Sequence, residues 1–139
     1  MSALVLDTNV LIPFLYDASR FIPYVRNYDE VILPATVLGE YRAGLFATKA
    51  GERNRKALED YLATPSVRTV PITDRTAELY AKVYQALRKQ GTPIPQNDMW
   101  IAASALEHGA DIATTDEHFR LVPMLTVIVL FETREQWAS

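Results

Sequence analysis

The chain of 139 residues contains no cysteine and only two histidines, His108 and His118. Without cysteine, disulfides, thiolate nucleophiles and cysteine-ligated zinc or iron–sulfur sites are excluded, and two histidines are too few for a histidine-rich metal site. Five Gly and eight Pro are too few for a low-complexity linker, and the sequence contains no internal repeats. Any bound metal is therefore expected to be held by oxygen ligands.

Long hydrophobic runs are also lacking. The apolar run from Val127 to Phe131 is far shorter than the roughly 20 residues that a membrane-spanning helix needs. The first residues carry no basic segment, and Asp7 interrupts the early apolar residues, which is not typical of a secretion signal. The length, with 49% hydrophobic and 22% charged residues, predicts one globular domain over residues 1–139, located in the cytoplasm with no membrane contact.

Short apolar runs alternate with segments of helical periodicity along the chain. The predicted strands are 3–6, 30–33, 67–72, 112–114 and 125–131. The predicted helices follow the first strand directly and then cover 37–45, 51–63, a segment from Thr73 to Gly91, and a segment from an Asn97 cap to Gly109. This alternation predicts a single-domain α/β fold, with a central parallel sheet of about five strands flanked by helices.

Four acidic residues stand at the positions where such a fold builds sites. Asp7 ends the first strand and Asp116 follows the fourth, so both are expected at the carboxyl edge of the parallel sheet. Asp98 is predicted in the first turn of its helix, where the helix dipole favours an anion. Glu40 borders the inward stripe of its helix, where an unpaired acid is unfavourable.

Each of these acids alone has an ordinary explanation as a turn, cap or solvated residue. Four carboxylates brought together would repel one another and raise some of their pKa values. Mg²⁺ or Mn²⁺, bound through a few carboxylates and retained waters, suits such a cluster. The acids together therefore predict a site for a divalent ion.

Each of the four acids lies in a short characteristic segment of the sequence. The segments are Asp7-Thr8-Asn9, Leu38-Gly39-Glu40-Tyr41, Asn97-Asp98 followed by Trp100-Ile101-Ala102-Ala103, and Thr114-Thr115-Asp116 followed by His118-Phe119. In their order and over nearly the whole chain, these segments resemble the motif series of the PIN-domain nucleases. In size and in the Ile-Ala-Ala and Asp-x-His-Phe segments, the sequence is most similar to the bacterial VapC toxins.

The resemblance implies a metal-dependent endoribonuclease that uses Mg²⁺ or Mn²⁺, as one ion or a pair, to leave 5′-phosphate and 3′-hydroxyl ends. It implies the toxin role of a toxin–antitoxin pair, with a cognate antitoxin as partner and tRNA or rRNA as substrate. Any of the carboxylates could hold the attacking water, and Asp98 is the preferred candidate. The implied catalytic and metal-binding residues are Asp7, Glu40, Asp98 and Asp116, and the implied polar supports are Asn9 and Thr114.

The net charge of −3 does not by itself favour a nucleic-acid partner. When the four candidate metal ligands are set aside, however, thirteen acids remain against fourteen Lys and Arg. The segment over residues 49–56 is locally basic, and its simplest interpretation is a face of the protein exposed to solvent. The candidate RNA contacts are Lys49, Arg53, Arg55 and Lys56 of this segment, with Arg42 and Arg120 near two of the acids.

Other residues have simpler interpretations. His118, next to Phe119 in a short turn, is expected to pack or cap, and His108 is expected to favour the dipole at a helix end. Met99 and Trp100 are predicted on the outer side of their helix. Together with Leu11-Phe14-Leu15 they predict more apolar surface than one small core can cover, and hence a homodimer.

Two other functions remain open from the sequence. One is a PIN-like fold that only binds RNA or protein, and the other is a structure-specific DNA nuclease, although those are usually longer. A phosphoaspartate phosphatase would need an acid where Asn9 stands. No Gly-rich phosphate loop with a Walker lysine is present, which disfavours nucleoside-triphosphate chemistry.

Overall fold

The computed structural model describes residues 2–130 and contains a five-stranded sheet in which all neighbouring strands are parallel. The strand order is β3-β2-β1-β4-β5. The strands are β1 (Ala3–Leu6), β2 (Glu30–Pro34), β3 (Val67–Val70), β4 (Asp111–Thr114) and β5 (Val127–Val129). The predicted parallel α/β fold is therefore confirmed.

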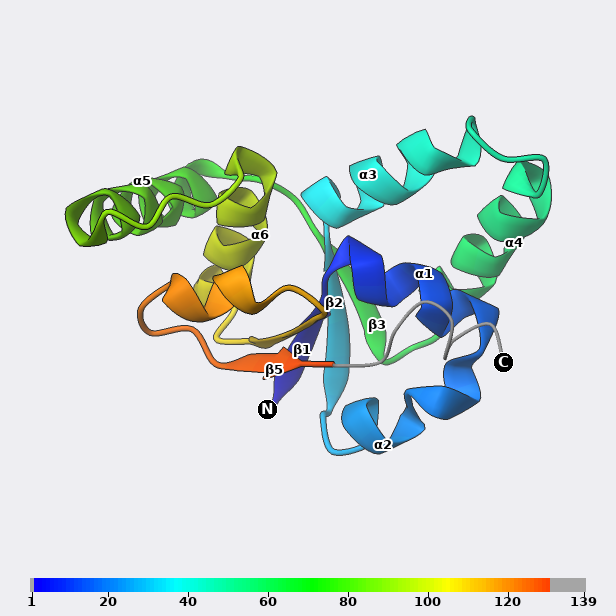
Figure 1. Cartoon of the computed structure of the whole chain (residues 1–139). Coiled ribbons are helices and arrows are strands. Elements are labelled where there is room, and N and C mark those ends of the chain that lie inside the picture. Colours follow the sequence, from blue (N-terminus) through cyan, green and yellow to red (C-terminus); the bar gives the residue numbers. More distant parts are fainter. Residues whose placement is uncertain (1, 131–139) are drawn as a thin grey trace.

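Helices cover both faces of this sheet. Figure 1 shows α5 and α6 on one side of the strands, and α1, α2 and α4 on the other. The helices are α1 (Thr8–Tyr16), α2 (Ile22–Val25), α3 (Ala35–Leu45), α4 (Gly51–Leu62), α5 (Asp74–Gln90) and α6 (Gln96–Glu107), with short 3₁₀ turns η1 (Ala18–Arg20) and η2 (Glu117–Leu121). Within residues 2–130, no helix combines the length and the apolar character needed to cross a membrane.

The central strands are buried on both faces, which explains why they are continuous apolar runs and do not alternate. Leu4, Val5 and Leu6 of β1 have no exposed surface, and Ile112 of the neighbouring β4 is equally buried. A strand covered by helices on both sides has no solvent face that would require polar residues. These strands form the rigid centre from which the site residues extend.

The strand order reverses direction at β1. The chain passes from β1 to β2 and β3 on one side, then returns to place β4 on the other side of β1. The register pairs Leu6 with Ala113, so the carboxyl ends of β1 and β4 lie next to each other. In open α/β sheets, this switch point is where binding crevices form.

Some predicted boundaries differ from the structure. The strand predicted over 67–72 ends at Val70, and the described part of the one predicted over 125–131 is limited to Val127–Val129, while Phe131 lies outside the described residues. The predicted Asn97 cap of α6 is wrong. Pro95, with extended backbone angles φ −55° and ψ 145°, is the N-cap, so Asn97 lies inside the first helical turn.

The predicted outward-facing apolar residues are mostly buried. Met99 is 8% exposed, and Leu11 and Phe14 of α1 are buried. Trp100 stacks on Tyr80 of α5, with ring centroids 4.1 Å apart. Neighbouring helices in the same chain therefore cover these residues, and the prediction that they form uncovered apolar surface for a homodimer is wrong. The exposed apolar side chains include Ile12, Tyr16, Phe46 and Met124.

Candidate active site

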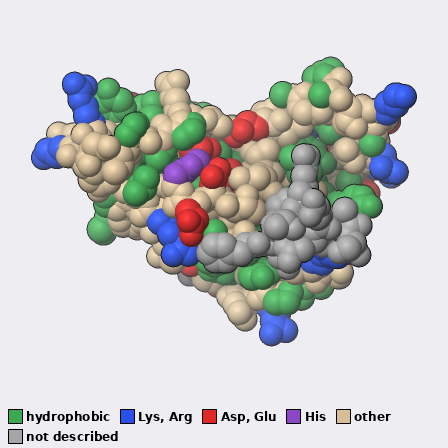
Figure 2. Space-filling model, in the orientation of Figure 1, with side chains coloured by type: hydrophobic (Ala, Val, Ile, Leu, Met, Phe, Trp, Pro, Cys, Tyr) green, Lys and Arg blue, Asp and Glu red, His purple; other side chains and the backbone are tan. Residues whose placement is uncertain are grey.

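The four candidate acids lie at the carboxyl edge of the sheet or on helices that border it. Asp7 directly follows β1, and Asp116 follows β4 by two residues. Glu40 lies in the middle of α3, and Asp98 lies in the first turn of α6. Figure 2 shows acidic side chains and a histidine gathered in the hollow between two raised parts of this face, while most of its Lys and Arg side chains lie at the margins.

Asp7 is the most deeply buried of these acids, with 4% of its surface exposed. The Thr8 backbone N–H donates to Oδ1 at 2.8 Å, and the Thr114 hydroxyl donates to Oδ2 at 2.8 Å. Burial raises the pKa of Asp7 to about 6, and the negative charges of Asp98 and Glu40 add to this, although the two hydrogen bonds oppose it. An acid in this setting is a strong candidate for binding a cation.

Glu40 joins three helices at the rim of the site. The Thr8 hydroxyl donates to Oε1 at 3.2 Å, and the Asn97 amide donates to Oε2 at 3.1 Å. Thr8 directly follows Asp7 in the sequence, and Asn97 directly precedes Asp98. These two hydrogen bonds therefore hold the Glu40 carboxylate close to both acids. Glu40 itself is exposed, which contradicts the sequence argument that it needs a partner because it is buried.

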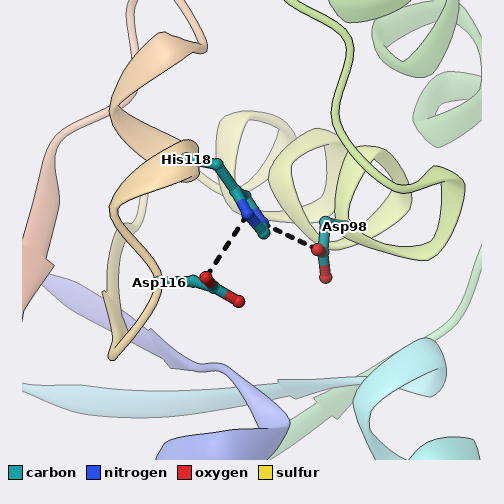
Figure 3. A group of neighbouring side chains, drawn as sticks. All are labelled: Asp98, Asp116 and His118. Atoms are coloured by element: carbon teal, nitrogen blue, oxygen red, sulfur yellow. Dashed lines mark hydrogen bonds and ion pairs between the residues drawn. The ribbon is translucent and has the colours of Figure 1, made fainter.

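Asp98 and Asp116 are joined by His118. Nε2 of His118 lies 2.8 Å from Oδ2 of Asp98, and Nδ1 lies 3.4 Å from Oδ1 of Asp116 (Figure 3). Burial raises the pKa of Asp98, against the opposing effect of His118. Ligand atoms from the three side chains all lie within 4.8 Å of one another.

The placement of His118 differs from the sequence interpretation, which expected a packing or capping residue. The η2 turn begins after Asp116, and Phe119 on this turn is fully buried. Burying Phe119 leaves the preceding side chain facing α6 and Asp98. The available sequence signal was the position of a histidine two residues after a candidate metal ligand.

The two predicted polar supports lie in the same hydrogen-bond network. Oδ1 of Asn9 accepts from the Thr115 backbone N–H at 3.3 Å, which ties α1 to the end of β4. The Thr114 hydroxyl accepts from the Asp116 N–H at 3.0 Å while it donates to Asp7. Thr114 therefore couples the positions of two acids through one oxygen.

In the described part of the chain, none of the six basic candidates forms an ion pair or a hydrogen bond with the four acids. Arg55 pairs with Glu52 and Glu59 on its own helix, so its charge is partly neutralised. Arg42, Lys49 and Arg55 line an open groove of about 420 Å³ between the end of α3 and the start of α4. The remaining three, which are exposed on α4 or in η2, are Arg53, Lys56 and Arg120. Contact between these residues and RNA stays a prediction.

The donor set fits a divalent cation. The carboxylates of Asp7, Glu40, Asp98 and Asp116 supply oxygen ligands of the kind that Mg²⁺ and Mn²⁺ prefer, and Asp7 and Asp98 are buried with raised pKa values. Within residues 2–130, no Lys or Arg forms an ion pair with any of these four acids. A bound cation would therefore relieve both the burial of charge and the mutual repulsion.

The raised pKa of Asp7 predicts an unusual pH dependence of stability in the metal-free protein. With the ordinary value at 3.8 and the folded value at about 6, the native state binds the proton more tightly. The tighter proton binding adds to the free energy of unfolding below pH 4, and this stabilisation is lost as the pH rises through 6. The reason is that the free energy of unfolding falls with pH wherever the native state holds more protons than the unfolded state. The difference corresponds to about 3 kcal/mol.

Thermal melts in EDTA at several pH values test this prediction. Relative to Asp7→Asn, which cannot titrate, the wild type is expected to lose stability between pH 4 and pH 6. Parallel curves for the two proteins would show that burial of the Asp7 charge has no effect on stability.

Comparison with known proteins identifies relatives along most of the chain. The PIN domain family matches residues 4–125. "Ribonuclease VapC4" of Mycobacterium tuberculosis is 31% identical over 124 residues, which are 89% of this chain and 94% of the relative. The extent of the domain over residues 1–139 stays a prediction.

Solved structures share the fold. The VapBC2 structure of Rickettsia felis, bound to a promoter DNA fragment, matches with a TM-score of 0.79 at 20% identity over 91% of this chain and 98% of that one. At that identity only the fold is shown. VapBC-5 of Mycobacterium tuberculosis, a member of the VapBC family of toxin-antitoxin systems, matches at 29% identity with a TM-score of 0.69, over 94% and 98% of the two chains. Because the PIN domain family matches residues 4–125 and the VapC4 relative is 31% identical over 89% of the chain, the chain belongs to the PIN-domain family and is a VapC-like member of it.

Proposed function

We propose that this protein is a metal-dependent endoribonuclease and the toxin of a toxin–antitoxin pair. It hydrolyses RNA phosphodiesters to 5′-phosphate and 3′-hydroxyl ends with Mg²⁺ or Mn²⁺. The observation that carries the proposal is the group of four acids from four separate segments at one edge of the sheet. The name of the VapC4 relative, a ribonuclease 31% identical to this chain, supports RNA as the substrate.

The chain's own residues prepare the site for catalysis. Thr8 and Thr114 hold both oxygens of Asp7, so that its lone pairs point in a fixed direction. Thr8 and Asn97 do the same for Glu40. A divalent ion, when bound, polarises the scissile phosphodiester and neutralises its charge. Asp98 is the preferred candidate to orient the attacking water, because it is buried and its charge interacts with those of both Asp7 and Asp116.

Selection of the RNA must come from elsewhere on the surface. Oxygen-held cations recognise phosphate, which is the same at every nucleotide, and carry no information on the base. Folded RNA offers unstacked bases and backbone shapes that a protein surface can distinguish. Cleavage is therefore expected at few positions of a structured RNA such as a tRNA or rRNA, in the cytoplasm where these RNAs are found.

The partner is proposed to be a cognate antitoxin protein. The support is the VapBC-5 match, which comes from a toxin-antitoxin system at 29% identity. A homodimer is proposed as well, but on different residues from those in the sequence argument. Ile12 and Tyr16 of α1 are 50% and 76% exposed and line, with Glu40, an open groove between α1, α3 and α4. This apolar surface is available for a protein partner.

Mapping the cleavage products tests the proposed activity. With Mg²⁺ or Mn²⁺ and a low amount of protein, we expect one or a few new 5′ ends in a folded tRNA or rRNA, each carrying a phosphate that a ligase can join. Even degradation of every RNA offered would contradict the proposed selectivity. Cleavage of DNA but not RNA would instead support a DNA nuclease, and no cleavage of either would support a binding module.

A further inference from the structure

His118 occupies a position inside the acidic group that the four-acid description of the site leaves without a role. Its Nε2 lies 2.8 Å from Oδ2 of Asp98, and its Nδ1 lies 3.4 Å from Oδ1 of Asp116. Both ring nitrogens therefore face carboxylates, from α6 on one side and from the end of β4 on the other (Figure 3). The side chain is 25% exposed, which leaves it accessible to an ion entering from solvent.

The orientation of this ring is set by its neighbours. Phe119 is fully buried and anchors η2, and its ring lies 5.0 Å from that of His118 at an angle of 35°. Asp98 is only 8% exposed, on a helix whose inner face is packed in the core. The imidazole and the Asp98 carboxylate are thus held at a fixed separation by two elements that are anchored independently.

That separation suits two ligands of one cation. Adjacent ligands on a six-coordinate ion with bonds of about 2.1 Å stand about 3.0 Å apart, close to the distance between Nε2 and Oδ2. Asp116 lies on the other side of the same ring, and one of its carboxylate oxygens lies within 4.8 Å of ligand atoms of both Asp98 and His118. The three side chains can therefore contribute ligands to one ion.

We propose that Nε2 of His118 is a direct ligand of the divalent ion in this site, and that the site therefore binds Mn²⁺ in preference to Mg²⁺. The inference rests on the proposed function, because it assumes that Asp98 and Asp116 bind the same ion. Mg²⁺ favours an all-oxygen shell, whereas nitrogen ligands are better tolerated by transition metals. The presence of one imidazole among carboxylates thus changes which ion is selected.

Pulsed EPR of the purified full chain with Mn²⁺ alone tests the proposal. Only two histidines exist in the chain, so His108 provides a matched control. Wild type and His108→Gln are expected to show coupling of Mn²⁺ to an imidazole nitrogen, and His118→Gln is expected to lose it. Mn²⁺ that binds the wild type without nitrogen coupling, or coupling that persists in His118→Gln, would overturn the proposal and leave the carboxylate site intact.

Binding titrations supply a second readout that does not depend on RNA. His118→Gln is expected to weaken Mn²⁺ binding more than about tenfold and Mg²⁺ binding by clearly less, since loss of a group next to a metal site commonly costs 10–100-fold in affinity. Equal losses for both ions would contradict the proposed selectivity. If the wild type binds neither ion, the proposed function fails, and this inference fails with it.

Discussion

Replacing Asp98 with asparagine is expected to lower the rate of RNA cleavage more than about 100-fold, since even groups that only support metal ligands commonly change activity 10–100-fold. The same loss is expected for Asp7→Asn. Both residues are buried acids with raised pKa values, so the change removes a charge that the site needs for a cation. The measurement is single-turnover cleavage of a labelled RNA at saturating metal.

The control for this prediction is Asp60→Asn. Asp60 is an exposed acid near the end of α4, which leads into the start of β3, and it is not one of the four site acids. Its replacement is therefore expected to leave cleavage unchanged. In metal-free buffer at neutral pH, Asp7→Asn is also expected to melt at a higher temperature than the wild type, because repulsion and burial of charge are relieved. If both site variants were less stable than the wild type without metal, the acids would be structural caps.

Expression of the wild-type chain in a bacterium, without an antitoxin, is expected to stop growth within a few generations. A toxin that cuts a tRNA or rRNA blocks translation, so a small amount of active protein has a large effect. The Asp7→Asn chain, expressed to the same level, is expected to allow normal growth. Growth curves together with sequencing of RNA 5′ ends provide the measurement.

The paired variants separate catalysis from other causes of harm. Equal toxicity of the wild type and Asp7→Asn would mean that the harm does not come from the acidic site. Growth arrest by the wild type without any new RNA 5′ end would point to binding without cleavage, which is the main alternative for a PIN-like fold.

The sheet and two of the site acids could be predicted from the sequence because their signals are local. Leu4 to Leu6 are apolar without alternation, and a polar residue follows at once, which fits a strand buried on both faces that ends at a sheet edge. The same holds for Ile112 to Thr114 before Asp116. Because parallel strands end at a common edge, the proximity of Asp7 and Asp116 follows from the topology.

The role of Asn97 could not be predicted, because it depends on a contact with a distant segment. From the local sequence, the Asn97 side chain is predicted to cap a helix. In the structure its amide instead donates to Glu40, 57 residues away, and Pro95 is the N-cap. His118 is a similar case. Its position two residues after Asp116 indicates only that it is near that acid, whereas its contact with Asp98 depends on the burial of Phe119, which fixes the turn.

The burial of Phe14 and Trp100 by other helices could not be predicted for a different reason. Helical periodicity shows which residues share a face, but it does not show whether another helix covers that face. Phe14 packs on Tyr61 of α4, with ring centroids 5.0 Å apart, and Trp100 packs on Tyr80 of α5. In both contacts the two residues are more than 19 positions apart in the sequence, so no local sequence pattern can reveal them.

The most direct test of the acidic metal site is to remove and restore the ion during RNA cleavage. The wild-type protein, dialysed against EDTA and then against metal-free buffer, is expected to leave a folded tRNA or rRNA intact. Addition of Mn²⁺ or Mg²⁺ is expected to restore cleavage at the same few positions in the wild type, but not in Asp98→Asn. Cleavage that persists at full rate after thorough chelation would contradict the central claim that these four acids act through a divalent ion.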